Sequence, residues 1–141
     1  MTIPTICVVD KDVVELLRKH DIQPTAQRME IARILVTRRT HLSAEDVFRI
    51  VNAEKRRVSK ATVYNTLGLF ADKGVVREVI ADPDRIFYDP NTVPHHHFFD
   101  VISGELTDIS ADQILVTGLP SLPVGAMLEG VDVIVRLRPA K

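Results

Sequence analysis

The sequence contains a single cysteine, Cys7, among its 141 residues. One cysteine excludes an internal disulfide and any zinc site built from Cys-x-x-Cys pairs. Long apolar runs are also missing, and Asp10, Lys11 and Asp12 interrupt the chain before a hydrophobic segment develops. No N-terminal signal peptide is therefore predicted. We expect a cytoplasmic protein that has no membrane partner.

The sequence also lacks an excess of charge of either sign. Its formal net charge is −1 at pH 7, which by itself indicates no class of partner. The distribution is more informative, because basic residues gather in the first half, at positions 38–39 and between 55 and 60. Hydrophobic residues make up 45% of the chain, which is enough for the core of one domain or of two small ones.

Helices are predicted throughout the first half of the chain. The first two are expected at residues 11–20 and 26–39, where apolar residues recur at helical spacing. The third begins at Ser43, which has an acidic residue three positions later and so resembles a capping box. The fourth runs from its cap, Ser59, to a stop at Gly74.

After the fourth helix the apolar period shortens to that of strands. Residues 75–81 and 85–89 predict one hairpin, and residues 97–102 and 105–109 predict a second. Three helices, then a helix followed at once by a hairpin, is the element order of a winged helix. In that fold the last helix enters the DNA major groove and the hairpin lies along the backbone.

The remainder of the chain is expected to be less regular. A short helix capped by Ser110 is predicted, followed by a loop rich in proline and glycine at 118–130 and a largely covered strand at 131–138. Two prolines bracket a polar stretch just before the histidine-rich strand. This composition predicts a boundary between a first domain at 1–90 and a second at 91–141.

Three adjacent histidines, His95, His96 and His97, lie where the second predicted hairpin starts. On a strand, successive side chains point to opposite faces, so His95 and His97 share one face and His96 points the other way. A divalent metal can therefore accept His95 and His97 together, but not all three. An exposed polar strand edge is the alternative interpretation.

Four motifs together resemble the ferric uptake regulator family: QPTAQR at 23–28, HLSAEDVF at 41–48, SKATVYNTL at 59–67 and HHHFFDVISGELTDI at 95–109. The resemblance covers nearly the whole chain. It is strongest to the iron response regulator branch, which shares the HHH strand and a closing strand like VDVIVRLR. It implies an α+β fold, with an N-terminal winged-helix DNA-binding domain and a C-terminal α/β dimerisation domain, and a dimeric, metal-responsive transcription regulator.

The chain departs from the family pattern in two places. Where many members have Cys-x-x-Cys, this sequence has Asp100 and Ser103, so a structural zinc held by four cysteines is not expected. Some iron response regulators also carry a Cys-Pro haem motif near the N-terminus. Here Cys7 is followed by Val8, which makes Cys7 a poor haem ligand.

The resemblance implies that the helix beginning at Ser59 reads DNA. Cationic side chains and free N–H groups at a helix start suit phosphate, and an asparagine amide can read adenine. Two copies would read a roughly palindromic operator in duplex DNA, which predicts a homodimer. The alternative is that Tyr64 fills the core and the charges form a solvated face. The predicted contacts are Arg28, Arg57, Ser59, Lys60, Thr62, Tyr64, Asn65 and Arg77.

Five residues match, spacing for spacing, the regulatory metal site of the family's peroxide-sensing members: His41, Asp89, His95, His97 and Asp108. Three imidazoles and two carboxylates suit iron(II) or manganese(II). Because His41 belongs to the DNA-binding domain, filling the site would fix the two domains in one orientation. The alternative for His41 is a helix-end histidine without a metal.

His96 would face away from that metal. The resemblance to the iron response regulators implies haem sensing through the run His95, His96 and His97, with His96 as the main candidate; a hydrogen-bonded surface histidine is the alternative. Two other functions remain open: a non-haem metalloenzyme of the cupin or facial-triad type, and a haem or metal carrier without DNA activity. A cupin needs a later histidine motif, and no histidine follows His97. We therefore expect a regulator of iron homeostasis, acting as a repressor, and no enzyme.

Overall fold

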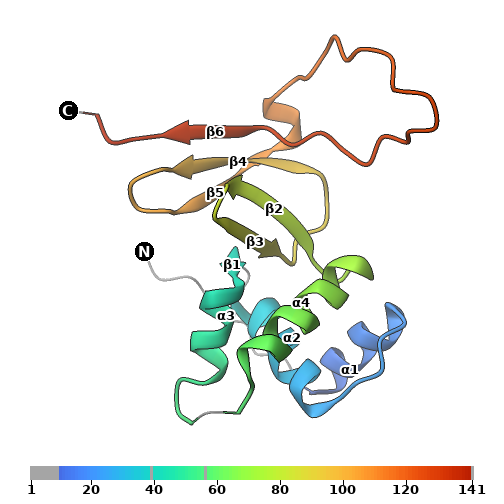
Figure 1. Cartoon of the computed structure of the whole chain (residues 1–141), viewed down its shortest axis with the longest axis vertical. Helices are drawn as coiled ribbons and strands as arrows, with labels where there is room; N and C mark the ends of the chain where they lie inside the picture. Colours follow the sequence, from blue (N-terminus) through green and yellow to red (C-terminus); the bar gives the residue numbers. More distant parts are fainter. Residues whose placement is uncertain (1–9, 39, 56, 141) are drawn as a thin grey trace. The chain divides into compact units, whose positions relative to one another are not determined.

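The computed structural model describes residues 10–38, 40–55 and 57–140 (Figure 1). Cys7 and two of the basic residues noted above, Arg39 and Arg56, lie outside the described residues. The chain forms two compact units, Met1–Thr92 and Val93–Lys141, called unit 1 and unit 2 below. In the described part of the chain, no helix has the length and apolar character needed to cross a membrane.

Unit 1 begins with four helices in the predicted order: α1 (Asp10–Lys19), α2 (Ala26–Arg38), α3 (Ala44–Val51) and α4 (Lys60–Asp72). Each helix buries one apolar face, and these faces meet in a single hydrophobic core. The fully buried side chains of that core include Leu17, Ile31, Val47, Val63, Leu67 and Phe70.

Local hydrogen bonds determine where α3 and α4 begin. Ser43 and Asp46 form the predicted capping box, with Asp46 N donating to Ser43 Oγ at 3.2 Å and Ser43 N donating to Asp46 Oδ2 at 3.0 Å. Ser59 caps α4 by accepting a hydrogen bond from Thr62 N at 3.1 Å. After α4, Gly74 has φ +83°, a left-handed conformation that favours glycine and ends the helix as predicted.

A small antiparallel sheet completes unit 1. Its strands are β1 (Leu42–Ser43), β2 (Arg77–Asp82) and β3 (Arg85–Asp89), in the order β1-β3-β2. The hairpin of β2 and β3 is the predicted wing. β1 was not predicted, because two residues are too few to show a strand period. Four helices followed by this hairpin make unit 1 a winged helix.

Unit 2 is built around a three-stranded sheet in the order β5-β4-β6. β4 (His95–Asp100) is the central strand and contains all three adjacent histidines. It pairs antiparallel with β5 (Leu106–Ser110) and parallel with β6 (Ile134–Leu137). The second predicted hairpin is therefore present, and its first strand begins two residues earlier than expected.

Two predictions for unit 2 were wrong in detail. The helix expected after Ser110 is a 3-10 turn, η1 (Ala111–Gln113), and the Ser110 side chain makes no capping hydrogen bond. β6 was expected to be largely covered, yet its last two residues are exposed, because within the described residues it is an edge strand paired on one side with β4. Between η1 and β6 the chain is irregular, as predicted for 118–130, and Figure 1 shows it looping away from the sheet and back.

Candidate metal site and nucleic-acid interface

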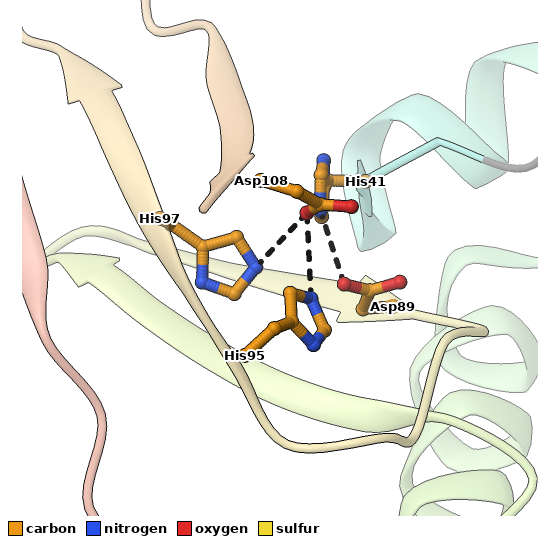
Figure 2. Close-up of side chains that lie close together, drawn as sticks. All are labelled: His41, Asp89, His95, His97 and Asp108. Carbon is orange, nitrogen blue, oxygen red and sulfur yellow. Dashed lines mark ion pairs between the residues drawn. The ribbon is translucent and has the colours of Figure 1, made fainter. Parts of the chain in front are cut away.

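In unit 2, two histidines of β4 face one carboxylate of β5. His97 lies directly opposite Asp108, and His95 lies opposite Ser110, which makes Asp108 its diagonal neighbour. Residues paired in this way present their side chains on the same face of the sheet. Asp108 Oδ1 accordingly lies 3.3 Å from His95 Nε2 and 3.4 Å from His97 Nε2 (Figure 2).

These distances suit shared coordination of a metal. Neighbouring ligands bound about 2.2 Å from one ion lie about 3 Å apart. One donor atom from each of His95, His97 and Asp108 lies within 4.8 Å of the other two. Nδ1 of His95 also contacts the backbone carbonyl of Val93. A proton on Nδ1 would leave the Nε2 lone pair available to an ion, which is how histidine ligands are commonly oriented.

In unit 1, His41 and Asp89 form a second group of donors. Continuing the β1–β3 register by one residue places His41 opposite Asp89, and His41 Nε2 lies 3.1 Å from Asp89 Oδ2 (Figure 2). Both side chains are largely buried. On the other side of β3, Arg77 is the register partner of Asp89, and its Nη1 is buried. This predicted DNA contact is therefore half-buried.

His96 occupies the opposite face of β4, as the strand alternation predicted. Its Nδ1 accepts a hydrogen bond of 3.1 Å from the backbone N–H of Val133, just before β6. The side chain is 8% exposed. His96 therefore connects two segments of unit 2, and a haem iron would have to reach a ring that is already buried and hydrogen-bonded.

The turn between β4 and β5 contains Asp100 and Ser103. Asp100 Oδ1 accepts hydrogen bonds from Ile102 N at 2.8 Å and from Ser103 N at 3.0 Å. The hydrogen bond from Ser103 N, followed by the one from Ile102 N, is the main reason that the pKa of Asp100 lies below its ordinary value. The carboxylate thus closes this turn through backbone hydrogen bonds.

On unit 1, one face of α4 is exposed. Lys60, Tyr64 and Asn65 are exposed there, and the four-residue spacing of Lys60 and Tyr64 places these two on the same side of the helix. Tyr64 is 45% exposed, so it does not fill the core. At the start of the helix, Ser59 Oγ donates to Thr62 Oγ1 at 2.9 Å, which ties these two predicted contacts to the cap.

Two predicted arginine contacts are held by neighbouring groups. Arg28 Nη1 donates to the backbone carbonyl of Gln23 at 2.9 Å. Arg57 Nη1 donates to Glu30 Oε1 of α2 at 2.8 Å. Both guanidinium groups are therefore oriented by hydrogen bonds within unit 1.

Glu45 of α3 was not among the predicted functional residues, although it contacts two of them. Its Oε1 lies 2.8 Å from Lys60 Nζ and accepts a hydrogen bond of 3.2 Å from Tyr64 Oη. The hydrogen bond with Lys60 is the largest cause of a lowered pKa at Glu45, and the same bond raises the pKa of Lys60. An acidic residue in the first turn of a helix is a common feature, so no pattern in the sequence indicated this contact.

Asn52 organises the loop between α3 and α4. Its Nδ2 donates to the carbonyls of Phe48 at 2.9 Å and Val58 at 3.0 Å. Its Oδ1 accepts from Arg57 N at 2.7 Å and Val58 N at 3.0 Å. One amide thereby satisfies four backbone groups and positions Arg57 just before the cap of α4. Sequence reasoning did not identify Asn52, because these partners meet only in the folded loop.

A cavity of about 300 Å³ opens on unit 1 between the start of α3, α4 and the tip of the hairpin. Glu45 and Tyr64 line one part of it, and Arg85 of the wing lines another. The cavity therefore has polar and charged groups of both signs on its walls.

Comparison with known proteins identifies relatives of this chain. Residues 19–119 match the profile of the Ferric uptake regulator family. The peroxide-responsive repressor PerR of Staphylococcus aureus strain Mu50 is 32% identical over 98 residues, which cover 70% of this chain. The match spans 66% of that relative's length, slightly less than two thirds.

Solved structures share the fold. The ferric uptake regulator of Pseudomonas aeruginosa with manganese aligns with a TM-score of 0.68 at 22% identity, over 95% of this chain and 100% of that one. A zinc-bound manganese uptake regulator aligns with a TM-score of 0.65 at 25% identity, over 91% of this chain and 98% of that one. These similarities support the α+β architecture expected from the sequence.

Proposed function

Because the chain belongs to the ferric uptake regulator family, whose members are transcription regulators and not enzymes, we propose that it is a metal-responsive transcription regulator. In this proposal it binds duplex DNA as a homodimer and acts in the cytoplasm. A metalloenzyme is not supported by this family membership.

The observation that carries the metal part of the proposal is the donor set. Within unit 2, Asp108 lies 3.3 Å from His95 and 3.4 Å from His97, and within unit 1, His41 lies 3.1 Å from Asp89. We propose that these five residues bind one iron(II) or manganese(II) ion, which mixed nitrogen and oxygen ligands suit. When bound, the ion would link the two units, because its ligands come from both. Of the two similar solved structures, one is a ferric uptake regulator with manganese and the other is a zinc-bound manganese uptake regulator.

The exposed face of α4 supports the DNA part of the proposal. Lys60 presents an ammonium group suited to phosphate, while Tyr64 and Asn65 present groups that can reach base edges. A single winged helix reads one half-site, so a homodimer would read a palindromic operator.

The finer proposal is a role in iron homeostasis with haem as a second effector, and it rests on the resemblance to the iron response regulators. For His96, this proposal leads to a prediction that can be tested. A haem iron bound there would compete with the hydrogen bond from Val133 N. Ferric haem should then give a Soret band that weakens in His96→Ala and is retained in Cys7→Ala.

One experiment tests metal and DNA together. Binding to the duplex upstream of the protein's own gene is measured by fluorescence anisotropy with chelator, with manganese(II) and with iron(II). We expect the metal to change the affinity of the wild type, and Asp108→Ala to remove that change and the rise in melting temperature caused by the metal. Tyr64→Ala should lower specific affinity by about 1–3 kcal/mol.

His20→Gln is the matched control, because His20 lies outside both donor groups and its Nδ1 contacts the Leu16 carbonyl. This variant should respond to metal as the wild type does. A wild-type chain that binds no duplex under any of the three conditions would exclude the regulator and favour a metal carrier. An Asp108→Ala variant with an unchanged metal response would exclude the proposed donor set.

A further inference from the structure

One carboxylate oxygen joins two DNA-facing groups of α4. Glu45 lies in the first turn of α3, and its Oε1 contacts Lys60 Nζ at 2.8 Å and Tyr64 Oη at 3.2 Å. Lys60 and Tyr64 are four residues apart, so their side chains lie on the same side of the helix. A single acidic group on a neighbouring helix therefore holds both.

The charges of this cluster explain why the contact forms. Lys60 is the first residue of α4, where the partial positive charge of the helix N-terminus disfavours a cation. A carboxylate beside it offsets that repulsion. The hydrogen bond between them lowers the pKa of Glu45 and raises that of Lys60, so both groups are charged at neutral pH.

The two groups that contact Glu45 are also the groups proposed to contact DNA. The Lys60 ammonium would bind a phosphate and the Tyr64 hydroxyl would reach a phosphate or a base edge. Glu45 and Tyr64 also line the cavity that opens towards Arg85 of the wing. In a winged helix, DNA lies along the surface formed by the last helix and the wing. The carboxylate thus occupies the place where a DNA phosphate would arrive.

We propose that Glu45 is a specificity-determining residue that competes with DNA phosphate for Lys60 and Tyr64. The proposal rests on the DNA-binding function proposed above. A phosphate bound at Lys60 must displace Glu45 or lie beside it, and both are unfavourable. A non-operator duplex is held by phosphate contacts alone, so its affinity depends fully on contacts such as this one. In an operator complex base contacts set the register and this phosphate contact matters less, so Glu45 lowers non-operator affinity more than operator affinity.

The test is Glu45→Gln, which keeps the side-chain shape and an oxygen able to accept the Tyr64 hydrogen bond. Dissociation constants are measured for the upstream duplex and for a scrambled duplex of the same length, over a series of salt concentrations. We expect affinity for the scrambled duplex to rise about three- to tenfold, and affinity for the upstream duplex to rise less. The salt dependence should steepen by up to about 0.9 in log–log slope, because Lys60 would neutralise one further phosphate.

Two controls separate this effect from a general change of charge. Glu129→Gln removes the same charge from an exposed site in unit 2 and should leave both affinities unchanged. In a Lys60→Gln background, Glu45→Gln should no longer steepen the salt dependence. Circular dichroism melting confirms that each variant is folded, which the exposed position of Glu45 favours.

The outcomes are distinct. An unchanged ratio of the two affinities in Glu45→Gln would overturn the proposal, and so would weaker binding to both duplexes, since Glu45 would then position Lys60 and Tyr64 for DNA. A wild-type chain that binds neither duplex would instead overturn the proposed function itself.

Discussion

Asp46 shows how a single residue makes the stability of the winged helix depend on pH. It closes the capping box of α3 through Ser43 and forms an ion pair of 3.0 Å with Arg49. Burial raises the pKa of Asp46, but the hydrogen bonds with Ser43 and the pairing with Arg49 together outweigh it and leave the pKa below its ordinary value. The ionised form is therefore favoured in the folded chain.

This lowered pKa predicts the direction of a pH effect. The contribution of Asp46 to the free energy of unfolding is complete above the unfolded-state pKa and is lost as the pH falls through the lower folded-state pKa. Asp46→Asn should reduce that free energy by up to about 1 kcal/mol at neutral pH. The difference from wild type should stay constant down to about pH 5 and shrink below about pH 4. Urea unfolding across this range measures it, and a difference that grows towards acid would contradict the assignment.

At the scale of elements, the loop between α3 and α4 determines how α4, the proposed DNA-reading helix, begins. Asn52→Ala removes four hydrogen bonds and should cost about 2–3 kcal/mol of unfolding free energy. Duplex binding should weaken too, since Arg57 and the cap of α4 lose their support. Chemical denaturation and anisotropy measure the two effects.

Matched variants separate stability from DNA contact in this loop. Asn52→Asp keeps the two accepted hydrogen bonds but places a carboxylate against the carbonyls of Phe48 and Val58, so it should be destabilised as well. Asn65→Ala changes an exposed amide of α4 and should leave stability unchanged while affinity falls. Equal stability of Asn52→Ala and wild type would show that the loop does not depend on this amide.

Some helices and strands could be predicted from the sequence, and others could not. α3, α4 and the wing were predicted because their caps and apolar periods are local features of the chain. β1 was missed because it consists of two residues, yet its register is what places His41 opposite Asp89. The coverage of β6 was predicted wrongly, because an apolar strand sequence does not indicate whether its strand lies at the edge of a sheet.

In the candidate site, too, some features could be predicted from the local sequence and others could not. Strand alternation correctly placed His95 and His97 on one face and His96 on the other. The contact of Asp108 with both histidines depends on the β4–β5 register, and the hydrogen bond of His96 with Val133 depends on a segment 37 residues away. Such long-range pairings have no local signal, and the family resemblance supplied Asp108. The role of these residues in metal binding stays a prediction.

At the scale of the whole molecule, the two proposed binding functions are divided between the units. The proposed DNA-reading helix α4 belongs to unit 1, and three of the five proposed metal ligands belong to unit 2. If one ion joins both units and DNA prefers the arrangement that the ion stabilises, metal binding and DNA binding are thermodynamically coupled. By linkage, the factor by which manganese changes duplex affinity equals the factor by which duplex changes manganese affinity. The wild type should obey this equality.

His41→Ala is expected to separate metal binding from coupling. Unit 2 keeps three donors, so manganese(II) should still bind, with affinity lower by about tenfold or more. The ratio of duplex dissociation constants with and without manganese should move towards one, because unit 1 loses its imidazole ligand. Calorimetric titration with manganese and anisotropy with duplex give both quantities. Asp108→Ala, in contrast, should lose metal binding and coupling together. Full coupling retained in His41→Ala would mean that this histidine does not link the two units.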